Sequence, residues 1–257
     1  MFAHLQILGD GMPKIYTEPF WHLGSYRYPY YRYKLRTLFE SYVKKSHLVL
    51  DAGCGDGGGY LVTMSQNTCG VGFDIDRKSI EKSMKKARDI QLHNLSFLVA
   101  DLDKMPFRKN QFNLIICCDV LEHLDNSEKA IRALSSSLKR GGRLLISTSN
   151  EFNPMMFIDL KLPKKVMDLI LRKSGVVHHK RTSRFNPWSL VEMLRKGELI
   201  IEKLLTFGYP PFPRPWIYQF SKIKPPRVYY LWILFNRLTN VSFLRKFKEN
   251  ILVVARK

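Results

Sequence analysis

Acidic residues are scarce in this 257-residue sequence, which holds 22 Asp and Glu against 42 Lys and Arg, a formal net charge of +20. The imbalance is uneven, since residues 47–150 hold 14 Lys or Arg against 12 Asp or Glu, whereas residues 151–257 hold 21 against 7. This asymmetry favours contact between the flanking regions and something anionic. Nucleic acid, a phospholipid surface and a phosphorylated substrate all stay open, as does a basic surface that is simply solvated.

Cysteine is also rare, with four residues and no Cys-x-x-Cys spacing, which is typical of a protein of the reducing cytosol. No apolar run reaches the roughly 18 residues that a membrane span needs. The first residues lack the basic region and apolar core of a signal peptide, so we expect a cytoplasmic protein. The eleven residues before Met12 show no periodic pattern, which leaves Met1 and Met12 as alternative first residues.

Internal repeats and low-complexity tracts are absent, and 45% hydrophobic with 25% charged residues is the composition of a globular protein. Apolar runs of strand length alternate with helical patterns through the middle of the chain. Strands separated by helices predict right-handed crossovers and a parallel sheet covered on both faces, an α/β doubly wound fold. The predicted strands are 47–52, 70–74, 95–100, 112–118, 143–148, 199–207 and 251–255, and the predicted helices are 59–66, 77–89, 127–139 and 187–196.

Two flanking regions differ in texture from this core. Residues 28–42 are aromatic and basic, and Tyr31, Leu35, Leu38 and Tyr42 at helical spacing predict a helix or lid near the mouth of the sheet. An insertion rich in proline and aromatic residues precedes the last strand. We therefore expect four segments: an N-terminal extension with a lid helix (1–46), an α/β core (47–207), an aromatic and basic insertion (208–249) and a last strand completing the core (250–257).

Carboxylates stand at the ends of the first four predicted strands, at Asp51, Asp74, Asp101 and Asp119. In an open parallel sheet, ligands bind outside the carboxyl ends of the strands, so these side chains should gather at one edge. The first of them opens a glycine-rich loop, residues 53–59. Glycine is favoured where the backbone adopts a positive φ or where a ligand approaches closely.

The glycines fit both a dinucleotide and S-adenosyl-L-methionine, because either cofactor also needs an acid for its ribose, and Asp74 lies about 20 residues beyond Gly53. Three features favour S-adenosylmethionine. Asp51 inside the turn would repel a pyrophosphate but suits an amino group and a sulfonium cation. Asp101 offers an acceptor where an adenine amino group would lie. The chain closes with two late β runs instead of a second mononucleotide half.

Five motifs in order carry a family resemblance: "VLDAGCGDGGGY", "GVGFDID", "FLVADLDKMPF", "FNLIICCDVLEHL" and "LKRGGRLLIST". They are similar to the successive motifs of class I S-adenosylmethionine-dependent methyltransferases. The resemblance is strongest to the small-molecule group that includes quinone-biosynthesis C-methyltransferases. It covers residues 47–150 well, and 187–207 and 250–256 more loosely. It implies a Rossmann-like sheet, mostly parallel with a terminal antiparallel strand, with an N-terminal helical segment and a helical insertion before the last strand.

The same resemblance implies the cofactor contacts made by the first two motifs. Asp51, Gly53, Gly55 and Gly57 would wrap the methionine part of the cofactor. Asp74 would hold the ribose hydroxyls.

Later motifs complete the implied cofactor site. Asp101 and the backbone of Leu102 would contact adenine, while Cys118 and Asp119 would border the sulfonium end. A purely buried role for Cys118 stays open, because its contact would be through the backbone.

Catalysis is less well marked, since methyl transfer from a sulfonium needs donor and acceptor held near contact and no obligatory proton carrier. His123 is the best-placed base, with a structural histidine at a helix start as the alternative. His178, His179 and Arg184 lie where this family often recruits acceptor contacts, and Tyr31 is a further acceptor candidate. No carboxylate or cysteine stands at ligand spacing beside the paired histidines, so no metal is expected.

The acceptor is predicted to be a small or amphipathic molecule, such as a prenylated quinone precursor or a lipid-linked sugar. The apolar run 228–235, flanked by Arg227 and Arg237, is too short to span a bilayer but long enough to lie in its interface, which would give a peripheral contact with anionic lipid at the inner membrane surface. A core helix that covers the sheet is the alternative. The turn after residue 118 lacks the Asn-Pro-Pro-aromatic pattern of adenine-N6 enzymes, and Cys117-Cys118 lack the proline of cytosine-C5 enzymes.

Other classes of function stay open at this stage. The basic flanks and the tyrosines of residues 26–33 suit an RNA methyltransferase. A non-catalytic S-adenosylmethionine-binding protein and, more remotely, a nicotinamide oxidoreductase are further alternatives. The oligomeric state and the acceptor atom are not fixed by these patterns.

Overall fold

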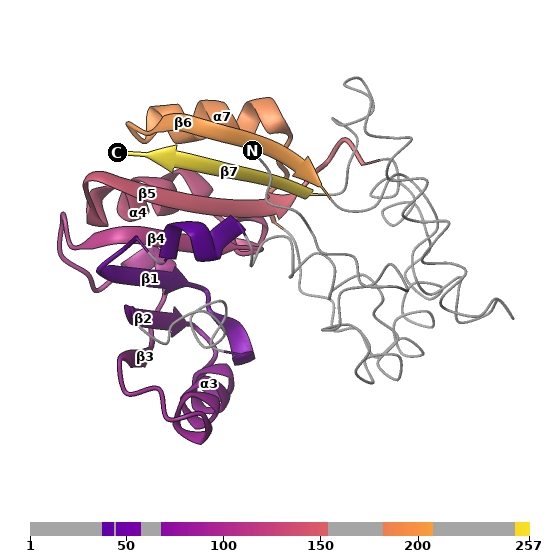
Figure 1. Ribbon diagram of the computed structural model, residues 1–257. Helices are drawn as coiled ribbons and strands as arrows, with labels where there is room; N and C mark the ends of the chain where they lie inside the picture. The colour runs from indigo at the N-terminus through magenta and orange to yellow at the C-terminus, as the bar shows by residue number, and fades with distance from the viewer. Residues whose placement is uncertain (1–37, 44, 58–67, 154–181, 208–249) are drawn as a thin grey trace, which may run out of the picture.

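The computed structural model describes residues 38–43, 45–57, 68–153, 182–207 and 250–257, which build a seven-stranded sheet with helices packed on it (Figure 1). Residues 38–43 are helical. The strands are β1 (Leu48–Ala52), β2 (Cys69–Asp74), β3 (Leu95–Val99), β4 (Phe112–Cys118), β5 (Leu138–Ser149), β6 (Ile200–Phe207) and β7 (Asn250–Arg256). The longer helices are α3 (Arg77–Asp89), α4 (Ser127–Ser137) and α7 (Pro187–Lys196), and the single 3-10 turns are η3 (Gly55–Gly57), η4 (Leu102–Lys104) and η5 (Leu121–His123).

Strand order in the sheet is β3-β2-β1-β4-β5-β7-β6. Strands β1 to β5 are parallel, whereas β7 lies antiparallel between β5 and β6. The predicted doubly wound, mostly parallel sheet with an antiparallel last strand is therefore confirmed. The chain winds outward from β1 to β3 and then returns to the other side of β1 at β4, so the strand order reverses between β1 and β4. Their carboxyl ends border the crevice where such sheets bind ligands.

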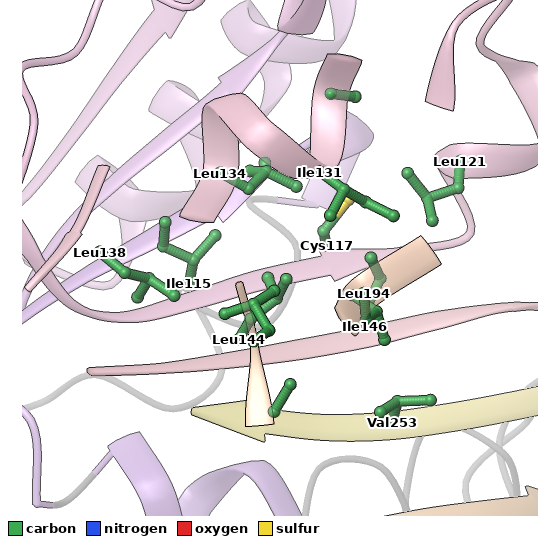
Figure 2. Close-up of a cluster of buried hydrophobic side chains, with 14 of the residues drawn as sticks. Ile115, Cys117, Leu121, Ile131, Leu134, Leu138, Leu144, Ile146, Leu194 and Val253 are labelled. Carbon is green, nitrogen blue, oxygen red and sulfur yellow. The ribbon is translucent and has the colours of Figure 1, made fainter. Parts of the chain in front are cut away.

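Alternate residues of each central strand enter two separate hydrophobic clusters. Ile115 and Cys117 of β4 join the cluster that α4 and α7 cover, which Figure 2 shows with Leu134 of α4 and Leu194 of α7. Ile116, on the opposite face of β4, packs in the cluster that includes residues of the 38–43 helix. Full burial of a side chain of this size contributes roughly 1.5–3 kcal/mol, so both layers stabilise the strands that carry the site.

Polar residues start the described helices. Asp76 caps α3 by accepting from the backbone of the first turn, and Asn186 caps α7 ahead of Pro187. Asn126 caps α4 by accepting a hydrogen bond from Lys129 N at 2.9 Å, which is one of the two caps expected from the sequence. These caps satisfy N–H groups that have no partner within the helix.

The end of α4 differs from the prediction, which continued the helix to residue 139. The helix ends at Ser137 because the backbone N–H groups of Asn110 and Gln111 donate to the carbonyls of Ser136 and Ser137, at 3.0 and 2.8 Å. Leu138 is already extended and pairs with β4, so β5 begins five residues earlier than predicted, with an irregular stretch before residue 143. A contact between segments far apart in the sequence therefore sets this boundary.

The described part of the predicted N-terminal helix buries two residues outside the helical pattern noted in the sequence. Phe39 and Val43 are 0% and 1% exposed, whereas Leu38 and Tyr42 of that pattern are only partly buried. The described part of this helix covers a face of the sheet over β1, β4, β5 and β7, and not its mouth.

Several predictions lie outside the described residues: the helix over 59–66, the remainder of the N-terminal helix and the 208–249 insertion. The division into four segments stays a prediction. No helix within the described ranges is long and apolar enough to cross a membrane.

Candidate functional site

The loop after β1 has backbone conformations that require glycine. Gly53 and Gly55 have φ of +75° and +62°, in the left-handed region that other residues rarely adopt. A Cβ on Gly53 would lie 2.3 Å from Val120 Cγ2, so this position has no room for a side chain. A Cβ on Gly55 would meet no atom of the described residues within 4 Å, so the space in front of Gly55 is open on their side. The loop is fixed by N–H groups of Gly53 and Cys54, which both donate to Phe73 O of β2.

Asp74 joins the end of β2 to this loop. Its Oδ2 accepts a hydrogen bond from Gly55 N at 2.9 Å, and its Oδ1 accepts one from Asp76 N at 2.9 Å. The half-buried carboxylate is therefore held in one orientation beside the glycine turn. The structure brings together the glycine loop and the acid that were predicted to share a cofactor.

Asp51 lies between the two halves of the site. It is only 2% exposed and sits in β1 beside Gly72 of β2 and Ile116 of β4. Burial first, and then the charges of Asp51 and Asp74, raise the pKa of the Cys54 thiol. These effects place the carboxylates of Asp51 and Asp74 near the Cys54 thiol, at the carboxyl ends of β1 and β2.

Asp101 follows β3 and starts the η4 turn. Its side chain accepts a hydrogen bond from Asp103 N at 2.9 Å, and the next residue, Leu102, is 5% exposed. Ala100 N donates to Asp74 O at 3.0 Å, so the ends of β2 and β3 are tied together. This hydrogen bond places Asp101, predicted to contact adenine, close to Asp74, predicted to hold the ribose.

Ile75 is a candidate binding residue that the sequence analysis missed. It stands between Asp74 and Asp76 at the end of β2, and 70% of it is exposed. A large aliphatic side chain this exposed beside an oriented carboxylate suits a flat apolar ligand such as a nucleobase. The signal in the sequence was one isolated apolar residue flanked by two aspartates directly after an apolar run.

Asp119 directly follows β4 and is exposed. Its φ is +56°, unusual for a residue other than glycine, and Ser147 fixes it: Asp119 N donates to Ser147 O at 2.9 Å, while Ser147 Oγ donates to Asp119 Oδ1 at 3.3 Å. Burial, followed by Asp119, raises the pKa of the Cys118 thiol well above its ordinary value. This shift disfavours the thiolate form, so Cys118 is poorly suited to act as a nucleophile.

His123 ends the η5 turn and is half-buried. The preceding residue, Glu122, is a carboxylate only 3% exposed, whose Oε2 accepts a hydrogen bond from Thr148 Oγ1 at 2.8 Å. Its backbone carbonyl accepts from the N–H groups of Thr182 and Ser183, at 2.8 and 3.2 Å. Glu122 was not singled out from the sequence, because none of its three partners is near it in the chain.

Of the predicted acceptor residues other than His123, Arg184 alone lies within the described ranges. Arg184 is exposed and lines a cavity of about 290 Å³ between the start of α4 and Met193 of α7, none of whose lining residues belongs to the glycine loop. Tyr31, His178 and His179 lie outside the described residues. Within the described ranges, no group of three or more His, Cys, Asp or Glu is placed to hold a metal ion.

Residues 44–198 match the sequence profile of the methyltransferase domain family, more than half of the chain. This chain belongs to that family. It is 33% identical over 129 residues to an uncharacterized protein of Methanocaldococcus jannaschii, covering 49% of this chain, and 23% identical over 172 residues to a ubiquinone biosynthesis O-methyltransferase of Rickettsia conorii, covering 65% of this chain. The chain spans about half the length of these relatives, 52% and 56%.

Solved methyltransferase structures share the fold. A geranyl diphosphate methyltransferase solved with S-adenosylmethionine is similar with a TM-score of 0.55 at 16% identity, covering 87% of this chain and 84% of that one. The predicted class of S-adenosylmethionine-dependent methyltransferases and its cofactor are confirmed at the level of the family. The individual site residues stay predictions.

The residues present fit that cofactor. S-adenosylmethionine carries an amino group and a sulfonium cation, and the crevice offers carboxylates of Asp51 and Asp74 with an open backbone turn between them. The space at Gly55 is one that a side chain would fill.

Proposed function

We propose that this methyltransferase-domain protein transfers the methyl group of S-adenosylmethionine to a hydroxyl group of a small amphipathic acceptor. The observation that carries the proposal is the hydrogen bond from Gly55 N to Asp74 Oδ2, which sets an oriented carboxylate beside an open glycine turn. When bound, the cofactor supplies a methyl group on a sulfonium that is ready for in-line displacement. The protein's task is then to hold donor and acceptor together and to exclude water.

Each side of the crevice takes one part of the donor. Asp51 and the turn of Gly53 and Gly55 hold the cationic methionine part, and Asp74 accepts hydrogen bonds from the ribose hydroxyls. Ile75 packs on the adenine ring, whose amino group donates to Asp101. Because Asp119, across the crevice, carries a negative charge, it stabilises the sulfonium end of the donor until transfer.

His123 removes the proton of the acceptor hydroxyl. A neutral imidazole nitrogen can take the proton as the methyl group leaves the sulfonium sulfur and the new oxygen–carbon bond forms. The proposal for oxygen as the acceptor atom is supported by the relative named as a ubiquinone biosynthesis O-methyltransferase. It is also supported by the position of His123 at the end of the η5 turn, four residues after Asp119.

The acceptor class follows from two names and from composition. One relative is named for ubiquinone and one structural neighbour for geranyl diphosphate, both of which are prenyl-bearing molecules. The aromatic and basic residues 208–249 are suited to meet such an acceptor at the surface of an anionic membrane. Peripheral membrane contact is therefore part of the proposal.

The test is to incubate the protein with methyl-labelled S-adenosylmethionine and with separate extracts of lipids, RNA and small molecules. Label in the lipid or small-molecule fraction is the expected result, and label in RNA would replace the proposed acceptor. Binding of S-adenosylhomocysteine without transfer to any fraction would show a binding protein in place of an enzyme.

A matched pair of variants tests the cofactor site. Asp74→Asn keeps the shape of the side chain but removes its charge, and we expect at least tenfold weaker binding of S-adenosylmethionine in calorimetry. Asp89→Asn makes the same change at the exposed end of α3 and should leave binding unaltered. Equal affinity in both variants would contradict the assignment of Asp74.

A further inference from the structure

Residues 182–186 cross the ends of β4 and β5 and grip the η5 turn. Thr182 N and Ser183 N both donate to the carbonyl of Glu122. The hydroxyls of the same two residues both donate to the carbonyl of Leu124, at 2.8 and 2.9 Å. The carbonyls at the end of a single 3-10 turn have no partner within the turn, so these four hydrogen bonds complete it from a segment nearly 60 residues away.

The gripping segment is itself attached to the end of β5. Phe185 forms a parallel bridge with Asn150, and Glu151 N donates to Phe185 O at 2.8 Å. Asn186 Nδ2 donates to Glu151 Oε1 at 2.6 Å. The segment therefore joins η5, β5 and the start of α7 in one hydrogen-bonded unit.

A second connection runs inside this unit through the side chain of Glu122. Its carboxylate accepts from Thr148 Oγ1 of β5, and the two residues are 3% and 0% exposed. Burying a carboxylate is costly unless it is hydrogen-bonded, and an apolar side chain of similar volume often stabilises a core at least as well. Glu122 then contributes orientation more than stability, because its hydrogen bond to Thr148 fixes the angle between η5 and β5, which an apolar contact would leave free.

We propose that Glu122 is a positioning residue that fixes η5, and with it His123, relative to the carboxyl ends of β4 and β5. Its side chain anchors the turn to Thr148, and its carbonyl anchors the turn to Thr182 and Ser183. It acts through His123 and does not touch the reacting atoms. This inference rests on the proposed function, since it assigns a task to the residue before the base.

The first arm of the test needs no acceptor. Amide hydrogen exchange is measured on the complex with S-adenosylhomocysteine, in the wild type and in Glu122→Ala, Glu122→Gln and Thr148→Val. We expect the amides of Thr182 and Ser183 to exchange at least tenfold faster in Glu122→Ala, and to recover in Glu122→Gln, whose amide oxygen still accepts from Thr148. Glu192→Ala on the exposed side of α7 is the matched control and should change nothing.

The second arm measures methyl transfer to a prenylated catechol. Glu122→Ala should lower kcat at least tenfold with less than a twofold change in the KM for S-adenosylmethionine, and Glu122→Gln should regain most of the rate. Thr148→Val should lower kcat in the same sense, and the double variant should be little worse than either single one.

Unaltered exchange and an unaltered rate in Glu122→Ala would overturn the inference. It would also be overturned if Glu122→Ala weakened cofactor binding and lowered the melting temperature along with the rate, because Glu122 and Thr148 would then be a merely structural pair. Failure of the wild type to methylate any acceptor overturns the proposed function instead. The exchange arm still decides whether Glu122 fixes the turn.

Discussion

Replacing each of the two left-handed glycines by alanine should separate folding from cofactor binding. Both substitutions force a Cβ into a left-handed backbone conformation, which costs about 1–2 kcal/mol. At Gly53 the new Cβ also lies 2.3 Å from Val120 Cγ2, and relieving such overpacking typically costs about 1–3 kcal/mol more. Gly53→Ala should therefore lower the free energy of unfolding by about 2–5 kcal/mol, against about 1–2 kcal/mol for Gly55→Ala.

Urea unfolding measures the difference, and Val120→Ala identifies its source. That substitution removes Cγ2 and leaves the Val120 Cβ at an ordinary 3.4 Å, so Gly53→Ala should be clearly less damaging in the Val120→Ala background. Gly55→Ala should behave oppositely in calorimetry: it folds well but binds S-adenosylhomocysteine at least tenfold more weakly, because its methyl group enters the space meant for the ligand. Equal destabilisation by the two alanines, or unimpaired binding by Gly55→Ala, would refute the reasoning.

Three further predictions concern ionisable groups. The pKa of Glu202 is lowered in the folded protein, mainly by its hydrogen bonds from Arg143. The pair therefore stabilises the fold above the ordinary carboxyl pKa, and this stabilisation is lost as the pH falls through the lowered pKa of the folded state. Glu202→Gln should thus lower the free energy of unfolding by about 1 kcal/mol or less at pH 7, because the pair is partly exposed, and the difference should shrink in acid. Iodoacetamide at neutral pH should modify the exposed Cys69 long before Cys118, whose pKa is raised by burial, as mass spectrometry of the labelled peptides can show. Lys257 Nζ donates to two carbonyls at the end of α4 and to one amide oxygen, so Lys257→Met should lower the free energy of unfolding by roughly 1–2 kcal/mol in urea titrations, and no change would contradict this role.

The features that were predicted correctly from the sequence are those that residues close together in the chain determine. The boundaries of α3 and α7 agree with the prediction because their caps, Asp76 and Asn186, lie beside the helices they start. The acids at strand ends were found because a parallel sheet brings carboxyl ends to one edge whatever the loops do.

What escaped the sequence depends on contacts between distant segments. The end of α4 is set by hydrogen bonds from residues 110 and 111. The buried face of the 38–43 helix is set by its contacts with four strands, which the helical spacing alone does not reveal. Glu122 looks like an ordinary charged residue of a turn until Thr148 and Thr182 are seen on either side of it. Ile75 became conspicuous only through its exposure.

The position of β7 has a consequence for the making of the protein. Strand β6 is translated some forty residues before its only partner among the described strands, since it pairs with β7 and not with β5. While the ribosome is still adding those residues, β5 and β6 both present open backbone edges, a state prone to pairing with other nascent chains. Because β7 joins β6 to β5, this side of the sheet can form only after residues 250–256 have emerged, so we expect chains truncated before residue 250 to be prone to association.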